Sequence, residues 1–147
     1  MDIHNIFLQA HRGFAYLALL LVALFIIALL FALVGNGGRK TKFFKVATTV
    51  TMILFHIQFL VGIIMLLFTS GFITTIKEIG MGGLMKNADL RFSYIEHPFS
   101  MLIAAVLMTI VNKKVKTNER ITIGIVIMAI IAVLLFSYAV PFAKLFN

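Results

Sequence analysis

The chain has 147 residues, of which 62% are hydrophobic, and it carries a formal net charge of +8 and no cysteine. A soluble domain is usually about 45–50% apolar and leaves much of its surface in water, so a water-soluble fold is excluded. The missing thiols exclude disulfides, thiolate metal sites, iron–sulfur clusters and covalent c-type haem attachment. The sequence therefore predicts one domain, residues 1–147, that lies in the lipid bilayer.

Apolar runs separated by polar turns make up most of the chain. The first run, residues 13–34, contains no charge and is too long for the core of a signal peptide, which spans about 7–15 residues. A Gly-rich basic turn, residues 35–45, leads to the second run, residues 46–68. The long connector that follows, residues 71–91, is interrupted by glycines. Its first part mixes apolar and charged residues, which is typical of an interfacial segment.

The third apolar run, residues 98–111, is too short to cross a bilayer alone. It would rise only about 21 Å as a helix, whereas the hydrocarbon core is about 30 Å thick. The helix is therefore expected to begin near residue 88 or 89, with Asn87 as its cap and Pro98 inside it. This start places His97 within the membrane or at its edge.

The fourth run follows a second basic turn, residues 112–120, and ends at Pro141. Each short turn carries four Lys or Arg residues, against five on the opposite side of the bilayer. Cytoplasmic loops are enriched in these residues, so both turns are expected inside and both termini on the outer side. Their position in turns indicates topology and no nucleic-acid partner. The sequence predicts an all-α integral membrane four-helix bundle with spans at about residues 12–34, 46–69, 89–112 and 121–140.

Polar groups inside apolar spans are costly, which makes them the first candidates for function. Measured from the cytoplasmic boundaries, His56 and His97 lie about 15 and 22 Å deep, and helix tilt removes much of this difference. His11, about 36 Å from the same side, is expected at the outer interface. Two imidazoles on facing helices are what a b-type haem requires, so His56 and His97 are the predicted iron ligands.

Three charged residues complete the predicted site. Arg91 and Arg12 lie near the outer edge, where a guanidinium suits the propionates of a haem. Glu96 is expected to exchange a proton at a quinone-like ligand or to hydrogen-bond a histidine. Each residue also has a structural alternative: the arginines as interfacial anchors, Glu96 as their ion-pair partner, and a membrane histidine as a strut between helices.

The chain also resembles a known family. The similarity covers most of the chain and lies in HRGFAYL (11–17), HIQFLVGI (56–63), RFSYIEHPFSMLIA (91–104) and FSYAVPF (136–142). These segments, in this order, resemble short bacterial four-span membrane proteins generally labelled cytochrome b-like. The resemblance implies a four-helix bundle in the bacterial inner (cytoplasmic) membrane, with its outer side periplasmic and with His11, His56 and His97 as candidate haem ligands. The chain departs from the family pattern at Arg12 and Ala15, where a small and a basic residue are usual.

Two functions fit these observations. The first is a b-type haem-binding membrane electron carrier that exchanges electrons with quinol or with a partner protein. The alternative is a non-catalytic scaffold subunit of a larger bacterial membrane complex that binds lipid or quinone. A transporter ranks last because the sequence has no repeats or rings of charge. The chain lacks G-x-S-x-G and H-E-x-x-H, so an electron-transfer or accessory subunit is favoured over a stand-alone enzyme.

Overall fold

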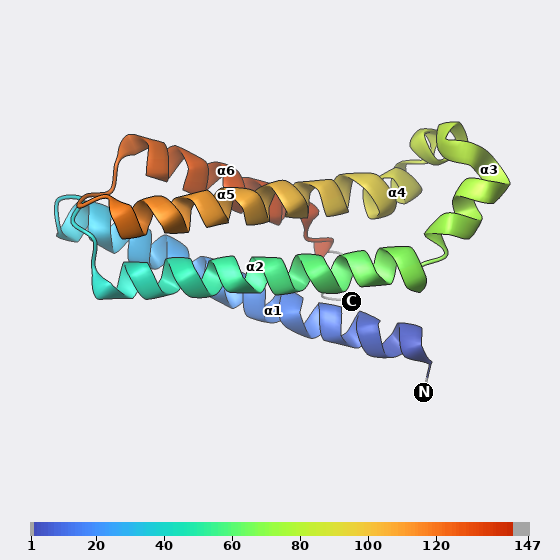
Figure 1. The fold of residues 1–147 in the computed structure, drawn as a ribbon, viewed down its shortest axis with the longest axis horizontal. Coiled ribbons are helices and arrows are strands. Elements are labelled where there is room, and N and C mark those ends of the chain that lie inside the picture. The colour runs from blue at the N-terminus through green and yellow to red at the C-terminus, as the bar shows by residue number, and fades with distance from the viewer. Residues whose placement is uncertain (1, 143–147) are drawn as a thin grey trace.

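A computed structural model describes residues 2–142, and this part of the chain is helical throughout apart from its turns (Figure 1). The predicted all-α class is confirmed. Helix α1 runs on into a π-helical segment, η1, and α4, η2 and α5 form one continuous helix. The elements are α1 (Ile3–Leu30), η1 (Phe31–Gly35), α2 (Lys42–Phe68), α3 (Phe72–Lys86), α4 (Ala88–Arg91), η2 (Phe92–Glu96), α5 (His97–Thr117) and α6 (Ile123–Ala139).

Three helical stretches of the described chain are long and apolar enough to cross a membrane, namely Ile3–Gly35, Lys42–Phe68 and Ala88–Thr117. The fourth, α6, is apolar but has only 17 residues, which span about 26 Å. Side chains such as those of Leu20 and Ile130 lie exposed on the outside of the helices, where a soluble protein would carry polar groups. These features indicate a multi-pass membrane protein. The orientation of the termini stays a prediction.

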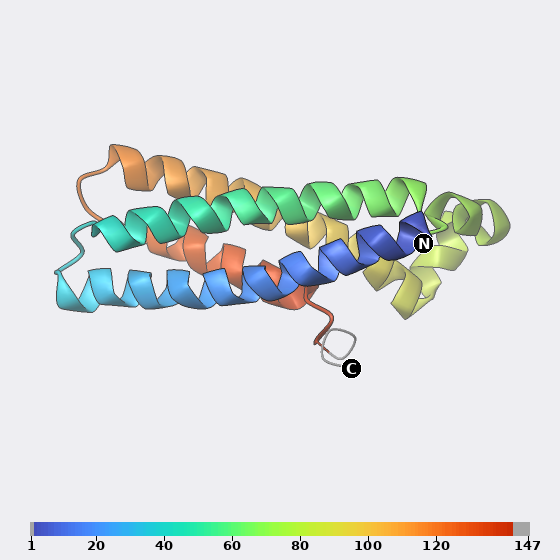
Figure 2. The same ribbon diagram turned by 90° about the horizontal axis from the view of Figure 1, so that it is seen from below.

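The long helices pack side by side in the order α1, α2, α5 and α6, and the two views of Figures 1 and 2 agree on this arrangement. Small residues such as Ala28 and Ala129 are fully buried between them and let the backbones approach closely. The short basic turns meet at one end of the bundle, where the Ile121 N–H donates to the Gly38 carbonyl at 2.9 Å. At the other end, α3 joins α2 to α4.

The third span begins at Ala88, as predicted from the thickness of the hydrocarbon core. Asn87 caps the helix, and its Oδ1 accepts from the N–H groups of Asp89 and Leu90, both at 3.1 Å. Pro98 lies inside the helix and has no N–H to donate to the carbonyl four residues earlier. The preceding turn widens into the π-helix η2, in which the His97 N–H reaches the carbonyl of Phe92. A π-bulge of this kind is common at functional positions.

Several helix ends differ from the predicted spans. Helix α1 begins at Ile3 and not at residue 12, because Asp2 caps its first turn with a 3.3 Å bond from the His4 N–H. At the basic end, α2 begins at Lys42 and the third span runs to Thr117, so part of each basic turn is helical. Lysine tolerates this position since its long side chain carries the charge back to the interface.

Candidate functional site

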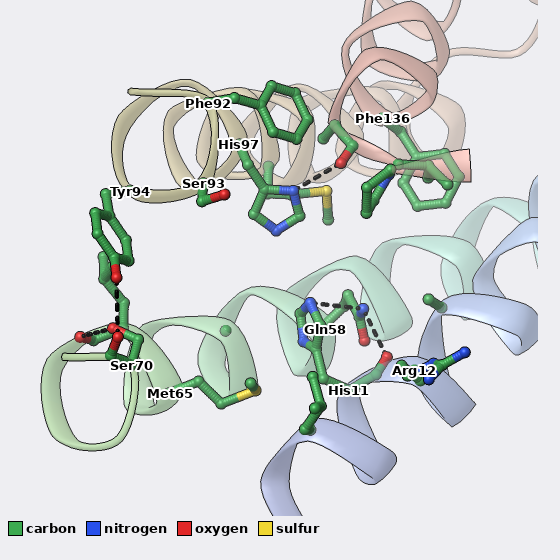
Figure 3. Close-up of a pocket in the computed structure, with 18 residues that line it drawn as sticks. His11, Arg12, Gln58, Met65, Ser70, Phe92, Ser93, Tyr94, His97 and Phe136 are labelled. Carbon is green, nitrogen blue, oxygen red and sulfur yellow. Dashed lines mark hydrogen bonds between the residues drawn. The ribbon is translucent and has the colours of Figure 1, made fainter. Parts of the chain in front are cut away.

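A cavity of about 420 Å³ lies between the helices, in the half of the bundle that adjoins α3 (Figure 3). Small-molecule sites in proteins occupy roughly 300–1,000 Å³ and have mostly apolar walls with a few polar groups. This cavity has the same character. Polar side chains reach it from every wall but α6, namely His11 and Arg12 of α1, Gln58 of α2, Ser93 and Tyr94 of η2, and His97 of α5.

The polar groups meet because each lies at a similar distance from the same end of the bundle. His11 is eight residues from Ile3, His97 nine from Ala88 and Gln58 ten from Phe68. These intervals correspond to about 12–15 Å of helix. On α1, cavity-lining residues recur at positions 8, 11, 12 and 15, which is the spacing of one helix face.

The sequence-based expectation that His11 lies farther out than His97 is wrong. The centroids of the two imidazole rings are 5.9 Å apart, with an interplanar angle of 67°. The error comes from the helix ends, since the third span continues to Thr117 and not only to residue 112. His97 is therefore 20 residues from its basic end, or about 30 Å, and comes level with His11 once α1 tilts.

His97 has one ring nitrogen bound and the other available. Its Nδ1 lies 2.7 Å from the carbonyl oxygen of Ala139, which accepts only, so Nδ1 carries the hydrogen. That carbonyl is free because the last residues of α6 have no intrahelical donor. Nε2 is left as a hydrogen-bond acceptor, and the ring points from α5 across the cavity toward His11 (Figure 3).

Gln58 sets the hydrogen position on His11. Its Nε2 donates to the His11 backbone carbonyl at 3.0 Å and lies 3.3 Å from His11 Nε2. An amide nitrogen only donates, so His11 Nε2 accepts and the imidazole hydrogen sits on Nδ1. Two buried atoms, His11 Nδ1 and Gln58 Oε1, then have no partner within the described chain. Gln58 is only 4% exposed, and buried polar atoms in proteins are normally hydrogen-bonded.

Gly62 makes room for His11 beside α2. A Cβ atom at this position would lie 3.2 Å from His11 Cε1. On the opposite wall, the ring of Phe92 packs on His97 at a centroid distance of 6.2 Å. The sequence did not single out Gly62 as a site residue, although a glycine four positions after a buried glutamine lies on the same helix face.

His56 lies outside the cavity. It is exposed, with Nδ1 at 2.8 Å from the Met52 carbonyl and Nε2 at 3.2 Å from Thr109 Oγ1 of α5. Both ring nitrogens are therefore engaged, and His56 joins α2 to α5 as a strut. The structure does not bring the predicted ligand pair together, because His56 faces away from the cavity that His97 lines.

Arg91 and Glu96 also lie outside the cavity. Arg91 Nε contacts Glu96 Oε1 at 2.7 Å, and its Nη1 donates to the Met85 carbonyl at 2.9 Å. Glu96 Oε2 in turn accepts from the Tyr138 hydroxyl at 2.5 Å. This arrangement joins the head of the third span to the last turn of α6. Of the sequence-predicted site residues, the cavity brings together His11, Arg12 and His97.

Comparison of the chain with protein-family models, with curated proteins and with solved structures gives no match. The resemblance to cytochrome b-like proteins stays a prediction. Within residues 2–142, the structure also shows no group of three or more His, Asp or Glu residues placed to hold a metal ion.

Proposed function

We propose that the chain is a membrane protein that binds the ring of a quinone or quinol in the cavity between His11 and His97. The observation that carries this proposal is the pair of buried atoms without a partner, His11 Nδ1 and Gln58 Oε1. A buried polar group left unsatisfied costs about 1–3 kcal/mol. A ligand that offers both an acceptor and a donor at this point removes the cost.

The hydrogen-bonding groups of the cavity complement a quinone ring. A quinone carbonyl accepts a hydrogen bond, which the Nδ1–H of His11 supplies when the imidazole turns from Gly62 toward the cavity. A quinol hydroxyl donates one, for which His97 Nε2 and Gln58 Oε1 are the available acceptors. The remaining wall is mostly apolar and suits a flat carbon ring. Quinones dissolve in hydrocarbon, so the membrane setting supports this class over water-soluble ligands.

The test is calorimetric titration of the protein in phosphatidylcholine nanodiscs with a tailless benzoquinone and its quinol. We expect saturable binding of both, and binding of the quinol that weakens about tenfold in His97→Ala and in Gln58→Leu, since each variant loses one acceptor for a quinol hydroxyl. The matched control is His56→Ala, which lies outside the cavity and leaves the affinity unchanged. Absence of saturable binding, or an equal loss in the control, would overturn the proposal.

A second candidate is the predicted b-type haem, now with His11 and His97 as its axial ligands in place of His56 and His97. The observation that favours it is the bond from His97 Nδ1 to the Ala139 carbonyl, because metal-bound histidines usually donate their other ring nitrogen in this way. His97 thus fits a haem iron through Nε2. His11 fits less well since Gln58 lies at its Nε2, although 3.3 Å is beyond the usual 2.7–3.2 Å of a strong bond.

A reduced-minus-oxidised absorption spectrum separates the two candidates. A haem protein purified from haem-supplied cells shows a b-type spectrum that disappears in His11→Ala and in His97→Ala and persists in His56→Ala. The pairing predicted from the sequence instead gives loss in His56→Ala and in His97→Ala. A colourless preparation that binds benzoquinone excludes the haem and leaves the first proposal standing.

A further inference from the structure

Within residues 2–142, the fourth wall of the bundle is shorter than the others beside the cavity. Helix α6 ends at Ala139, whereas α1 and the third span continue toward α3 (Figures 1 and 2). Val140 and Pro141, which follow α6, still line the cavity. Beyond them, no helix of the described chain stands between α1 and η2. The cavity therefore reaches the place where α6 stops.

A strap joins two walls of the cavity near α3. The Tyr94 hydroxyl donates to the Ser70 carbonyl at 2.9 Å and so joins η2 to the end of α2. The Tyr94 ring also packs edge-on against Phe72 of α3 at 5.4 Å. Ser70 and Tyr94 both line the cavity, and Figure 3 shows their bond at one side of it.

The side between α1 and η2 borders the bilayer. The flanking residues that line the cavity are mainly apolar, with Leu8 on α1 and Phe92 on η2, and Arg12 is the cation among them. These positions lie within about 15 Å of the helix ends that adjoin α3. An amphiphile bound near this end of the bundle would keep its ring close to the interface and its tail in hydrocarbon.

We infer that the quinone bound here carries a long apolar tail, which leaves the cavity sideways into the bilayer between α1 and η2. This inference rests on the proposed function, and it assigns the ligand to isoprenoid quinones and not to small soluble ones. In the bilayer the tail gains only van der Waals contact with α1 and η2, because lipid is already as apolar as their side chains.

Photo-crosslinking in phosphatidylcholine nanodiscs tests the route of the tail. The probe is a benzoquinone with a decyl tail and a terminal diazirine, and the crosslinked peptides are mapped by mass spectrometry. We expect crosslinks on the first turns of α1 and on η2, suppressed by excess tailless benzoquinone. Crosslinks confined to the strap between Ser70 and Tyr94 overturn the sideways route.

Affinity measurements separate failure of this inference from failure of the proposed function. With partition into lipid corrected for, the decyl probe is expected to bind with about the same affinity as tailless benzoquinone, because its tail passes from the cavity into the bilayer. Leu8→Trp narrows the gap and is expected to weaken binding of the decyl probe more than that of tailless benzoquinone, whereas Ile6→Trp, on the exposed opposite face of α1, leaves both affinities unchanged. If tailless benzoquinone binds and the decyl probe does not, or if Leu8→Trp affects both equally, this inference alone fails. If tailless benzoquinone does not bind, the proposed function fails with it.

Discussion

At the level of single residues, the contact between Gly62 and His11 is the most sensitive point of the cavity. His11 Cε1 occupies the space beside α2 that a Cβ at position 62 would enter at 3.2 Å. His11 also lies close to Gln58, so it has little freedom to move aside. A single methyl group at position 62 therefore changes the site without changing its chemistry.

Gly62→Ala is expected to weaken benzoquinone binding on the order of fivefold, equivalent to about 1 kcal/mol. The close contact with His11 offsets the helix preference of alanine over glycine, which is about 1 kcal/mol, so the thermal stability is expected to rise less than in Gly13→Ala. Calorimetric titration and thermal unfolding in detergent measure the two effects separately.

Gly13→Ala is the matched control for this substitution, since a Cβ at position 13 of α1 meets nothing within 4 Å. It gains the full helix stability of alanine and keeps the affinity of the wild type. A Gly62→Ala protein with unchanged affinity would show that His11 does not contribute to the site.

His56→Leu is expected to lower the stability without affecting ligand binding. The imidazole joins α2 to α5 through Thr109, and interhelical hydrogen bonds of this type contribute about 0.6–1.7 kcal/mol in membranes. Thermal unfolding detects the loss, and Thr109→Val is expected to lower the stability in the same way. Additive losses in the double variant would contradict a direct bond between the two side chains.

The roles of His56 and Gln58 show what the sequence could not settle. Two residues that are two positions apart on a helix point about 200° away from each other, so only one of them faces the cavity. In a helix of a soluble protein, the residue that faces outward would be recognised because it lies on the polar face. In α2 apolar residues surround the whole helix, because lipid replaces water outside it. The sequence pattern therefore does not show which of the two residues faces the interior of the bundle. The structure does not bring the predicted pair, His56 and His97, together in the cavity.

At the level of helices, the end of α6 is held by two contacts from the third span. His97 binds the Ala139 carbonyl, and Glu96 accepts from Tyr138. Both contacts come from the same turn, which η2 widens ahead of Pro98. The cavity wall formed by the last turn of α6 thus depends on the geometry around Pro98.

Tyr138→Phe is expected to lower the Tm by a few degrees at most, since the bond is exposed and screened. The expected functional effect is weaker retention of the tailed quinone, because the end of α6 is held by one contact in place of two. Glu78→Gln on α3, an exposed carboxylate far from α6, serves as the control. An equal Tm decrease in both variants would show that the bond between Tyr138 and Glu96 has no specific effect on stability.

The sequence predicted one helix start correctly and missed several other helix ends. The start near Ala88 followed from a length requirement, because the apolar run beginning at Pro98 cannot cross the hydrocarbon core. The start of α1 at Ile3 did not follow, since Asp2 and the residues after it are ordinary for a loop as well as for a helix. The ends near Lys42 and Thr117 were missed because charge marks the membrane boundary and not the last helical residue.

At the level of the whole molecule, the two basic turns define one end of the bundle. They are predicted to face the cytoplasm, and the chain contains no cysteine to interfere with labelling. In whole cells, Lys40→Cys and Lys116→Cys are expected to react with a membrane-impermeant maleimide only after permeabilisation. Lys77→Cys, on α3, is expected to react in intact cells. The reverse pattern would place both termini in the cytoplasm.

The backbone bond between Gly38 and Ile121 has a mechanical consequence. It joins the hairpin of α1 and α2 to the hairpin of α5 and α6 at the basic end, so that this end can act as a hinge. At the far end the hairpins are linked through α3, which contains a kink at Gly80. An opening of about 5° at this bond would displace the far helix ends by roughly 3.5 Å at a distance of about 40 Å. The two hairpins would therefore separate most beside His11 and His97, while the packing next to the Gly38–Ile121 bond would stay intact.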